Sequence, residues 1–245
     1  MDFFSIYDTL IENIDSDLTI DACRSGEYWA MAEVAGSAGL GMATEGTSIP
    51  PLFPEGLSGQ PLREAARAVK SWNFQEASFG LAAVNAFYNT AARMDMLNCR
   101  EPDGGYYTDG LELAGKTVAF IGHMHGPKAL RELAKEVYII EKDPQPGDYP
   151  DSACDYILPR CDLVIITGSS LVNKTLPHLL ELCKNAYTIL TGPSVPMCPA
   201  LLHFGIDRLA GLVLTDRPGI RAHVQSSVPG SPYPYGIPFL LERCK

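Results

Sequence analysis

The sequence contains no apolar run long enough to cross a membrane. No segment approaches the roughly 20 consecutive apolar residues that a spanning helix needs, and residues 1–8 lack the basic and then apolar pattern of a secretory signal. Basic residues are also scarce, because 19 Lys and Arg stand against 29 Asp and Glu, for a net charge of -10. Nucleic acids and anionic membranes both select basic surfaces. We therefore predict a cytoplasmic protein that binds neither of them.

Several chemical signatures are missing too. The seven cysteines are an odd, scattered set without any Cys-x-x-Cys pair, which indicates reduced thiols, several of them buried. The phosphate-binding pattern Gly-x-Gly-x-x-Gly is absent, which argues against tight binding of intact NAD. The chain also shows neither a nucleophile elbow nor a Ser-His-Asp arrangement.

Core-forming residues are present in ordinary amounts. Apolar residues make up 46% of the 245 residues and aromatic residues 9%, enough for one large domain or two smaller ones. In the first part, apolar residues at helical spacing predict helices over 3–14, 62–72 and 75–93. Between the first two helices, three short runs predict an antiparallel meander. We predict an α+β domain over residues 1–98.

A linker over residues 99–112 precedes a regular alternation of strands and helices. Buried strands are predicted at 118–122, 137–141, 162–167, 186–191 and 211–215. Helices are expected between them, including short ones over 176–184 and 199–204, with Thr175 as an N-cap. This pattern predicts an α/β fold, in which a Rossmann-like parallel sheet of order 2-1-3-4-5 occupies residues 113–245. The Pro-rich segment 228–235 is expected to be an extended arm that packs on the other domain or on a second copy in a homo-oligomer.

In a sheet of this order, the first and third strands diverge at their carboxyl ends and leave a crevice where ligands bind. The loops 122–126 and 167–175 would line this crevice, and the loop 191–198 would lie beside it. All three carry small, hydroxyl-bearing or metal-capable residues. Their convergence is the main functional indication in the sequence.

The turn from Gly122 to Gly126 carries His123 and His125. Imidazoles bind transition metals and exchange protons near neutral pH. Without a third ligand nearby, the alternative is that both histidines bond to backbone or solvent. His side chains would also crowd the approach of a pyrophosphate to the two glycines.

Glu141 ends the second predicted strand, where nucleoside-binding folds place an acid on a ribose hydroxyl. This position, with Gly122 and Gly126, favours a cofactor such as S-adenosylmethionine or NAD(P). The alternative is an ordinary solvated acid at a strand end.

Other candidates are polar residues of the neighbouring loops and of a buried helix. The loop after the third strand offers four donors to an anionic ligand, or else only turn and cap bonds: Ser169, Ser170, Asn173 and Thr175. Ser194 lies in the loop after the fourth strand. Asn85, on a helix that is apolar nearly all round, either pins an adjacent loop or faces the cleft.

Four stretches give the chain a family resemblance. They are residues 79–86 (FGLAAVNA), 167–173 (TGSSLVN), 192–196 (GPSVP) and 205–211 (GIDRLAG). In these the chain resembles the heavy-metal chelation family of prokaryotic two-domain proteins. The resemblance implies an N-terminal domain like that of enolase, a Rossmann-like domain and a site between them. Because no barrel follows the first domain, it does not imply enolase chemistry.

We therefore expect a small ligand or metal chelate to bind in the interdomain cleft. The expected contacts come from the turn histidines, the donors of the loop after the third strand, Ser194 and Asn85. Whether the chain makes or modifies a chelator as an enzyme, or only binds one, stays open. The alternatives are an enzyme with a nucleoside-containing cofactor on Glu141, and a non-catalytic binding or regulatory subunit.

Overall fold

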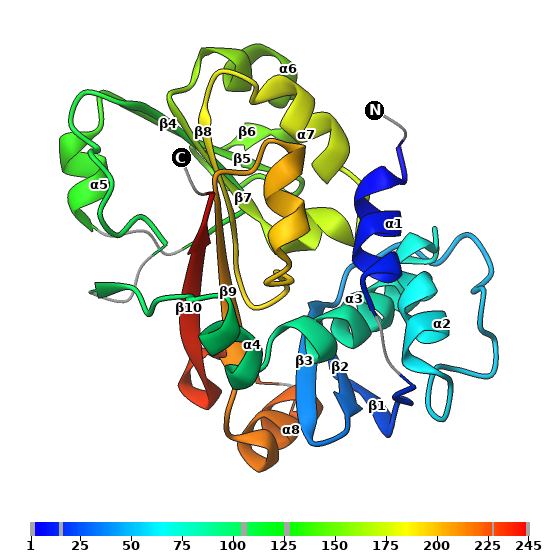
Figure 1. Cartoon of the computed structure of the whole chain (residues 1–245). Helices are drawn as coiled ribbons and strands as arrows, with labels where there is room; N and C mark the ends of the chain where they lie inside the picture. The colour runs from blue at the N-terminus through cyan, green and yellow to red at the C-terminus, as the bar shows by residue number, and fades with distance from the viewer. Residues whose placement is uncertain (1–2, 15–16, 104–106, 125–127, 227, 244–245) are drawn as a thin grey trace.

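The computed structural model describes residues 3–14, 17–103, 107–124, 128–226 and 228–243. Two sheets organise these residues (Figure 1): a three-stranded antiparallel sheet from the first part of the chain and a larger, mostly parallel sheet of seven strands. The predicted α/β class is confirmed. No helix in the described ranges is both long and apolar enough to traverse a bilayer. The predicted division of the chain at residues 99–112 stays a prediction.

The small sheet and its helices come from the first hundred residues. Their elements are α1 (Ser5–Glu12), β1 (Ala22–Ser25), β2 (Trp29–Val34), β3 (Ser37–Met42), α2 (Leu62–Ala66), η1 (Arg67–Lys70), α3 (Phe74–Tyr88) and α4 (Ala91–Met96). The strands pair in the order β1-β2-β3, as expected of a meander. Helix α3 lies directly on β3. The two elements are so close that a Cβ at Gly39 would come within 2.2 Å of the Ala82 carbonyl oxygen. Glycine at this position is what allows the close approach.

The helix predicted over residues 75–93 is two helices. The backbone leaves the helical conformation at Asn89 (φ -96°, ψ 69°). The Thr90 side chain then accepts a bond from the Arg93 amide and starts α4. The single-helix prediction was wrong here because Asn89 bonds to the second part of the chain instead of continuing the helix.

The large sheet confirms the predicted strand order. Its parallel strands are β4 (Thr117–Ile121), β5 (Glu136–Glu141), β6 (Tyr149–Pro150), β7 (Leu163–Thr167), β8 (Tyr187–Thr191) and β9 (Arg208–Leu214). The full order is β10-β9-β8-β7-β4-β5-β6, so the five predicted strands follow the order 2-1-3-4-5. After the Pro-rich segment the chain forms β10 (Gly236–Glu242), which pairs antiparallel with β9 of the same sheet.

Helical segments cover both faces of the large sheet. They are α5 (Lys128–Leu133), η3 (Asp151–Ala153), α6 (Cys154–Ile157), η4 (Leu158–Arg160), η5 (Gly168–Leu171), α7 (Leu176–Leu182) and η6 (Pro199–Phe204). The later helix α8 (Arg217–Gln225) packs instead on β1 and β2 of the small sheet, with η7 (Tyr233–Tyr235) beside it. Alternate residues of β7 enter different apolar clusters: Val164 packs with α7 residues, whereas Ile165 packs with Leu130 of α5. The first of these clusters also contains Tyr7 and Ala82 from the first part of the chain. The two parts therefore share a continuous core.

Candidate functional site

The carboxyl ends of β4, β5 and β7 meet at the switch point of the sheet. Strand β4 pairs with β5 on one side and with β7 on the other. Gly122 follows β4 with φ at +102°, and a Cβ there would lie 3.1 Å from Cγ2 of Thr167 and 4.0 Å from Oε1 of Glu141. The structure thus brings Gly122, Glu141 and Thr167 together, and the left-handed turn favours glycine at the first of them.

Glu141 holds this turn in place. Its Oε1 atom accepts a 2.7 Å bond from the His123 amide, and its Oε2 atom accepts a 3.0 Å bond from the Lys142 amide. Both carboxylate oxygens therefore already have backbone donors, although each retains capacity for another bond. The predicted contact of Glu141 with a ribose stays a prediction.

His123 lies between two carboxylates. Its Nε2 atom is 3.1 Å from Oδ2 of Asp148, and its Nδ1 atom is 4.0 Å from Oε1 of Glu141. The Asp148 side chain is only 6% exposed and also accepts a 2.8 Å bond from the Gln145 amide, so the carboxylate that faces His123 is fixed. An imidazole oriented by a fixed carboxylate is suited to proton transfer or to metal ligation.

The second histidine of the turn, His125, and the glycine after it, Gly126, lie outside the described residues. Within the part of the chain that is described, no three His, Cys, Asp or Glu side chains form a metal-binding group. The His123–Asp148 pair alone therefore has too few ligands for a closed metal site.

The loop after β7 uses most of its polar groups internally. The Ser170 hydroxyl, 1% exposed, donates a 2.7 Å bond to the Thr167 carbonyl. The Asn173 Oδ1 atom accepts bonds from the Thr175 amide (3.2 Å) and hydroxyl (2.7 Å). Thr175 is the N-cap residue of α7, as predicted, but its side chain makes no cap bond. The half-buried Ser169 hydroxyl lies 3.2 Å from the hydroxyl of Thr167, the residue whose side chain lies beside Gly122.

Two further candidates connect to β3 rather than to the Gly122 turn. The Ser194 hydroxyl accepts a 2.9 Å bond from the Met42 amide and so joins the two parts of the chain. The Asn85 amide nitrogen donates a 2.7 Å bond to the Leu40 carbonyl, so Asn85 holds strand β3 rather than an adjacent loop. Its Oδ1 atom is buried and has no partner among the described residues.

Lys174 is a conspicuous residue of this region that the sequence analysis missed. It has a left-handed backbone (φ +66°) and is 3% exposed. Its Nζ atom donates a 2.7 Å bond to the Val172 carbonyl and lies 5.5 Å and 5.6 Å from the ring centres of Tyr7 and Phe74. Burial lowers the pKa of Lys174 to about 7. A lysine in a loop between strand and helix is ordinarily solvated, so no sequence pattern signalled this burial.

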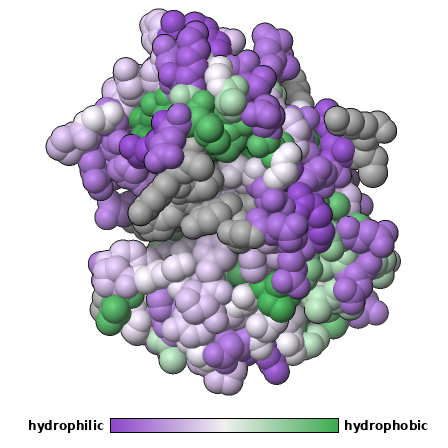
Figure 2. Space-filling view, turned by 90° about the vertical axis from the view of Figure 1, so that its left-hand side faces the viewer, coloured by the Kyte–Doolittle hydropathy of each residue, from purple (hydrophilic) through white to green (hydrophobic). Residues whose placement is uncertain are grey.

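Much of one face of the molecule is hydrophilic. Figure 2 shows this face, with a hydrophobic patch in its upper part. Together, the fold and the switch-point residues define a class of protein. It is a mixed α/β protein in which a small antiparallel sheet packs against a large parallel one whose strand ends carry a His–carboxylate pair.

The chain belongs to the family described as "putative heavy-metal chelation". Two family models with this description match it, one (DUF4213) over residues 7–88 and the other (DUF364) over residues 110–231. The resemblance inferred from the four sequence stretches is thereby confirmed.

Solved structures share the whole fold. A protein of unknown function from the DUF364 family of Desulfitobacterium hafniense is 35% identical, and the match covers 98% of each chain with a TM-score of 0.88. A second DUF364 structure, from Pyrococcus horikoshii, is 23% identical, covers 99% of this chain and all of its own, and has a TM-score of 0.82. An uncharacterized protein of Methanocaldococcus jannaschii is 29% identical over 162 residues, which span 63% of this chain and 61% of that protein.

Proposed function

We propose that this protein binds a small metal chelate at the carboxyl ends of β4, β5 and β7 and acts in heavy-metal handling. The observation that carries the proposal is the position of His123, on a glycine turn at the switch point and between Asp148 and Glu141. One imidazole and one fixed carboxylate are too few ligands for a tight structural metal site. They suit a metal ion that arrives with ligands of its own, since the chelator then fills the remaining coordination positions of the metal.

The test is metal binding by tag-free protein. Thermal unfolding is followed with zinc, nickel, cobalt and molybdate, each alone and with a small carboxylate chelator such as citrate. We expect at least one of these probes to raise the unfolding midpoint of the wild type. His123→Ala should raise the probe concentration needed for the same shift of the unfolding midpoint at least about tenfold, because each lost ligand costs more than about 1.4 kcal/mol of binding free energy.

A matched control is available on the surface. His178 pairs with Asp155 at 3.1 Å, but both side chains are more than half exposed and neither ends a strand of the sheet. His178→Ala should leave the metal response unchanged. A wild-type protein that responds to no probe, or an equal loss in both variants, would count against the proposal.

A second candidate function rests on the position of Glu141. This residue ends the strand next to β4, where a nucleoside-containing cofactor would place its ribose. Thermal-shift measurements with S-adenosylmethionine and NAD(P) test this candidate. A shift that is lost in Glu141→Gln would favour it over metal binding.

A further inference from the structure

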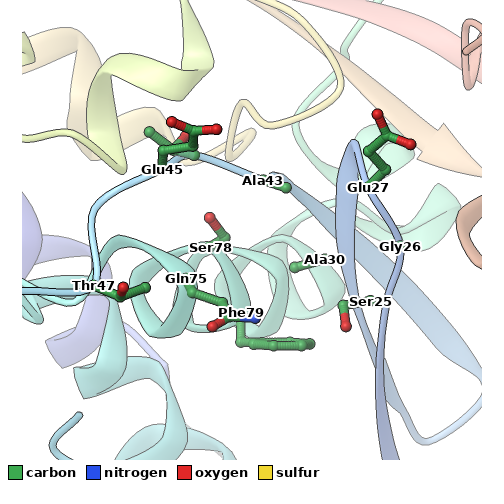
Figure 3. A pocket seen from close by; sticks show the side chains of 11 residues that line it. Ser25, Gly26, Glu27, Ala30, Ala43, Glu45, Thr47, Gln75, Ser78 and Phe79 are labelled. Atoms are coloured by element: carbon green, nitrogen blue, oxygen red, sulfur yellow. The ribbon is translucent and has the colours of Figure 1, made fainter. Parts of the chain in front are cut away.

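A pocket lies in the first part of the chain and includes no residue of the Gly122 turn. It measures about 260 Å³ and lies between the β1–β2 turn, the segment after β3 and helix α3. Figure 3 shows the side chains of Glu27 and Glu45 on opposite sides of the pocket, with the Ser78 hydroxyl directed toward the space between them. A pocket of this size holds a ligand smaller than a typical drug molecule.

The lining of this pocket carries charge of one sign. Glu27 and Glu45 are its ionisable residues, and no basic side chain lines it. Within the described ranges, neither carboxylate takes part in an ion pair. Glu27 accepts a hydrogen bond from the Tyr28 phenol, which raises the pKa of that phenol. The phenol is neutral, so it does not offset the negative charge of Glu27. The pocket therefore attracts a cation and repels an anion.

The rest of the lining distinguishes an organic cation from a bare metal ion. The amide of Gln75 and the hydroxyl of Thr44 are acceptors suited to N–H donors, whereas Ala30 and Phe79 provide apolar surface. An aromatic ring also attracts an ammonium group or stacks on a planar body. A metal ion would need three or more close ligands, and the described residues form no such group.

The pocket is also built into the packing of the whole chain. Gly26 lies so close to α8 that a Cβ there would come within 1.7 Å of the Val224 carbonyl oxygen. On the opposite wall, the Ala43 amide donates a 2.9 Å bond to the Tyr28 carbonyl, and the preceding residue, Met42, is bonded to Ser194. Because both walls are anchored, the backbone that carries the two exposed glutamates is fixed before any ligand arrives, which reduces the ordering cost of binding.

We infer that this pocket binds a small organic cation, namely a protonated amine attached to an apolar or planar body. The ammonium group lies between Glu27 and Glu45, and the apolar body lies on Ala30 and Phe79. This assignment does not depend on the ligand of the Gly122 turn, because the pocket and that turn have no residue in common.

The experiment is isothermal titration of the full chain with benzylammonium, and with benzyl alcohol as the uncharged analogue of the same shape. We expect millimolar or tighter binding of the amine, weakened by salt, and at least about tenfold weaker binding of the alcohol. Glu27→Gln and Glu45→Gln should each weaken amine binding about three- to tenfold, because each removes half of the charge of the pocket. Phe79→Leu should weaken binding of benzylammonium more than binding of methylammonium, which has no ring to stack.

Glu55→Gln is the matched control, since Glu55 is an exposed acid of the same part of the chain that does not line the pocket. Its amine affinity should equal that of the wild type. Equal binding of alcohol and amine, or no change in either pocket variant, overturns the inference. Binding of zinc or magnesium but not of amines also overturns it and assigns the pocket to a metal. Loss of the metal response in His123→Ala with amine binding intact would show that the two sites are separate.

Discussion

Replacing Lys174 with methionine is expected to raise the free energy of unfolding at pH 7 by on the order of 3 kcal/mol. Among the residues that the structure describes, this buried lysine has no carboxylate partner, and its amine makes a single bond, to the Val172 carbonyl. Methionine has a similar length and keeps the contacts with the rings of Tyr7 and Phe74. Its backbone would have the same left-handed strain as lysine, so the strain cancels in the comparison.

The effect should depend on pH in a defined direction. Burial lowers the pKa of Lys174 from 10.5 in an exposed chain to about 7 in the native one. Between these two values the unfolded chain holds a proton that the native chain does not, so the lysine penalty shrinks as pH rises. The advantage of Lys174→Met is therefore full below pH 7 and falls by up to about 1.4 kcal/mol per pH unit above it. Tyr7, which packs against Lys174, stays neutral over this range because burial raises the pKa of its phenol.

Urea unfolding of both proteins between pH 6 and pH 10 measures this difference. The free energy of unfolding of the wild type is subtracted from that of Lys174→Met at each pH. This subtraction removes the contributions of the cysteine and tyrosine groups that also titrate in this range. Lys184→Met, at an exposed lysine just after α7, is the control and should change stability little at any pH. A difference between the wild type and Lys174→Met that is constant over this range would show that Lys174 is charged and solvated in the native state.

The sheet order and the switch point could be predicted because their signals are local. Each parallel strand is a short apolar run, and a sheet of order 2-1-3-4-5 brings the ends of β4 and β7 together whatever the loops contain. Gly122 and Glu141 therefore lie where the sequence placed them. Two other residues of the predicted site, Ser194 and Asn85, bond to β3, and a shared site with the Gly122 turn stays a prediction for them.

Other features depend on contacts that a local pattern does not reveal. Lys174 is buried because α1 packs over the loop after β7, where the Tyr7 hydroxyl donates to the Leu171 carbonyl across 164 positions of sequence. Asp148 faces His123 from a loop between β5 and β6 that resembled an ordinary Pro/Gly-rich turn. Helix α8 did leave a signal, since Asp216 caps its first turn and a proline follows within that turn. Gly219 and Arg221, which follow that proline, obscured it.

The second large effect is expected at Asn89, where the two parts of the chain are bonded through one amide group. Its nitrogen donates to the Val195 carbonyl (2.9 Å) and the Leu212 carbonyl (3.2 Å), and its oxygen accepts from the Met197 amide (2.9 Å). Asn89 is 3% exposed, so water cannot replace these bonds without opening the junction. Alanine would leave two carbonyls and one amide buried without this partner, and each such group costs about 1 to 3 kcal/mol.

We therefore expect Asn89→Ala to lower the free energy of unfolding by about 3 to 5 kcal/mol, which is a large part of the stability of an ordinary domain. Asn13→Ala is the matched control, because the exposed Asn13 amide makes one 2.8 Å bond, to the Thr9 carbonyl, and its loss should cost less than about 1 kcal/mol.

Urea unfolding measures both variants, and hydrogen exchange locates the change. Exchange should increase at the Met197 amide and at the end of α3 before it increases in the centre of the large sheet, because the bonds of Asn89 join these segments. If Asn89→Ala were as stable as Asn13→Ala, the junction would be held by its apolar core alone, and the amide would only set the position at which α3 ends.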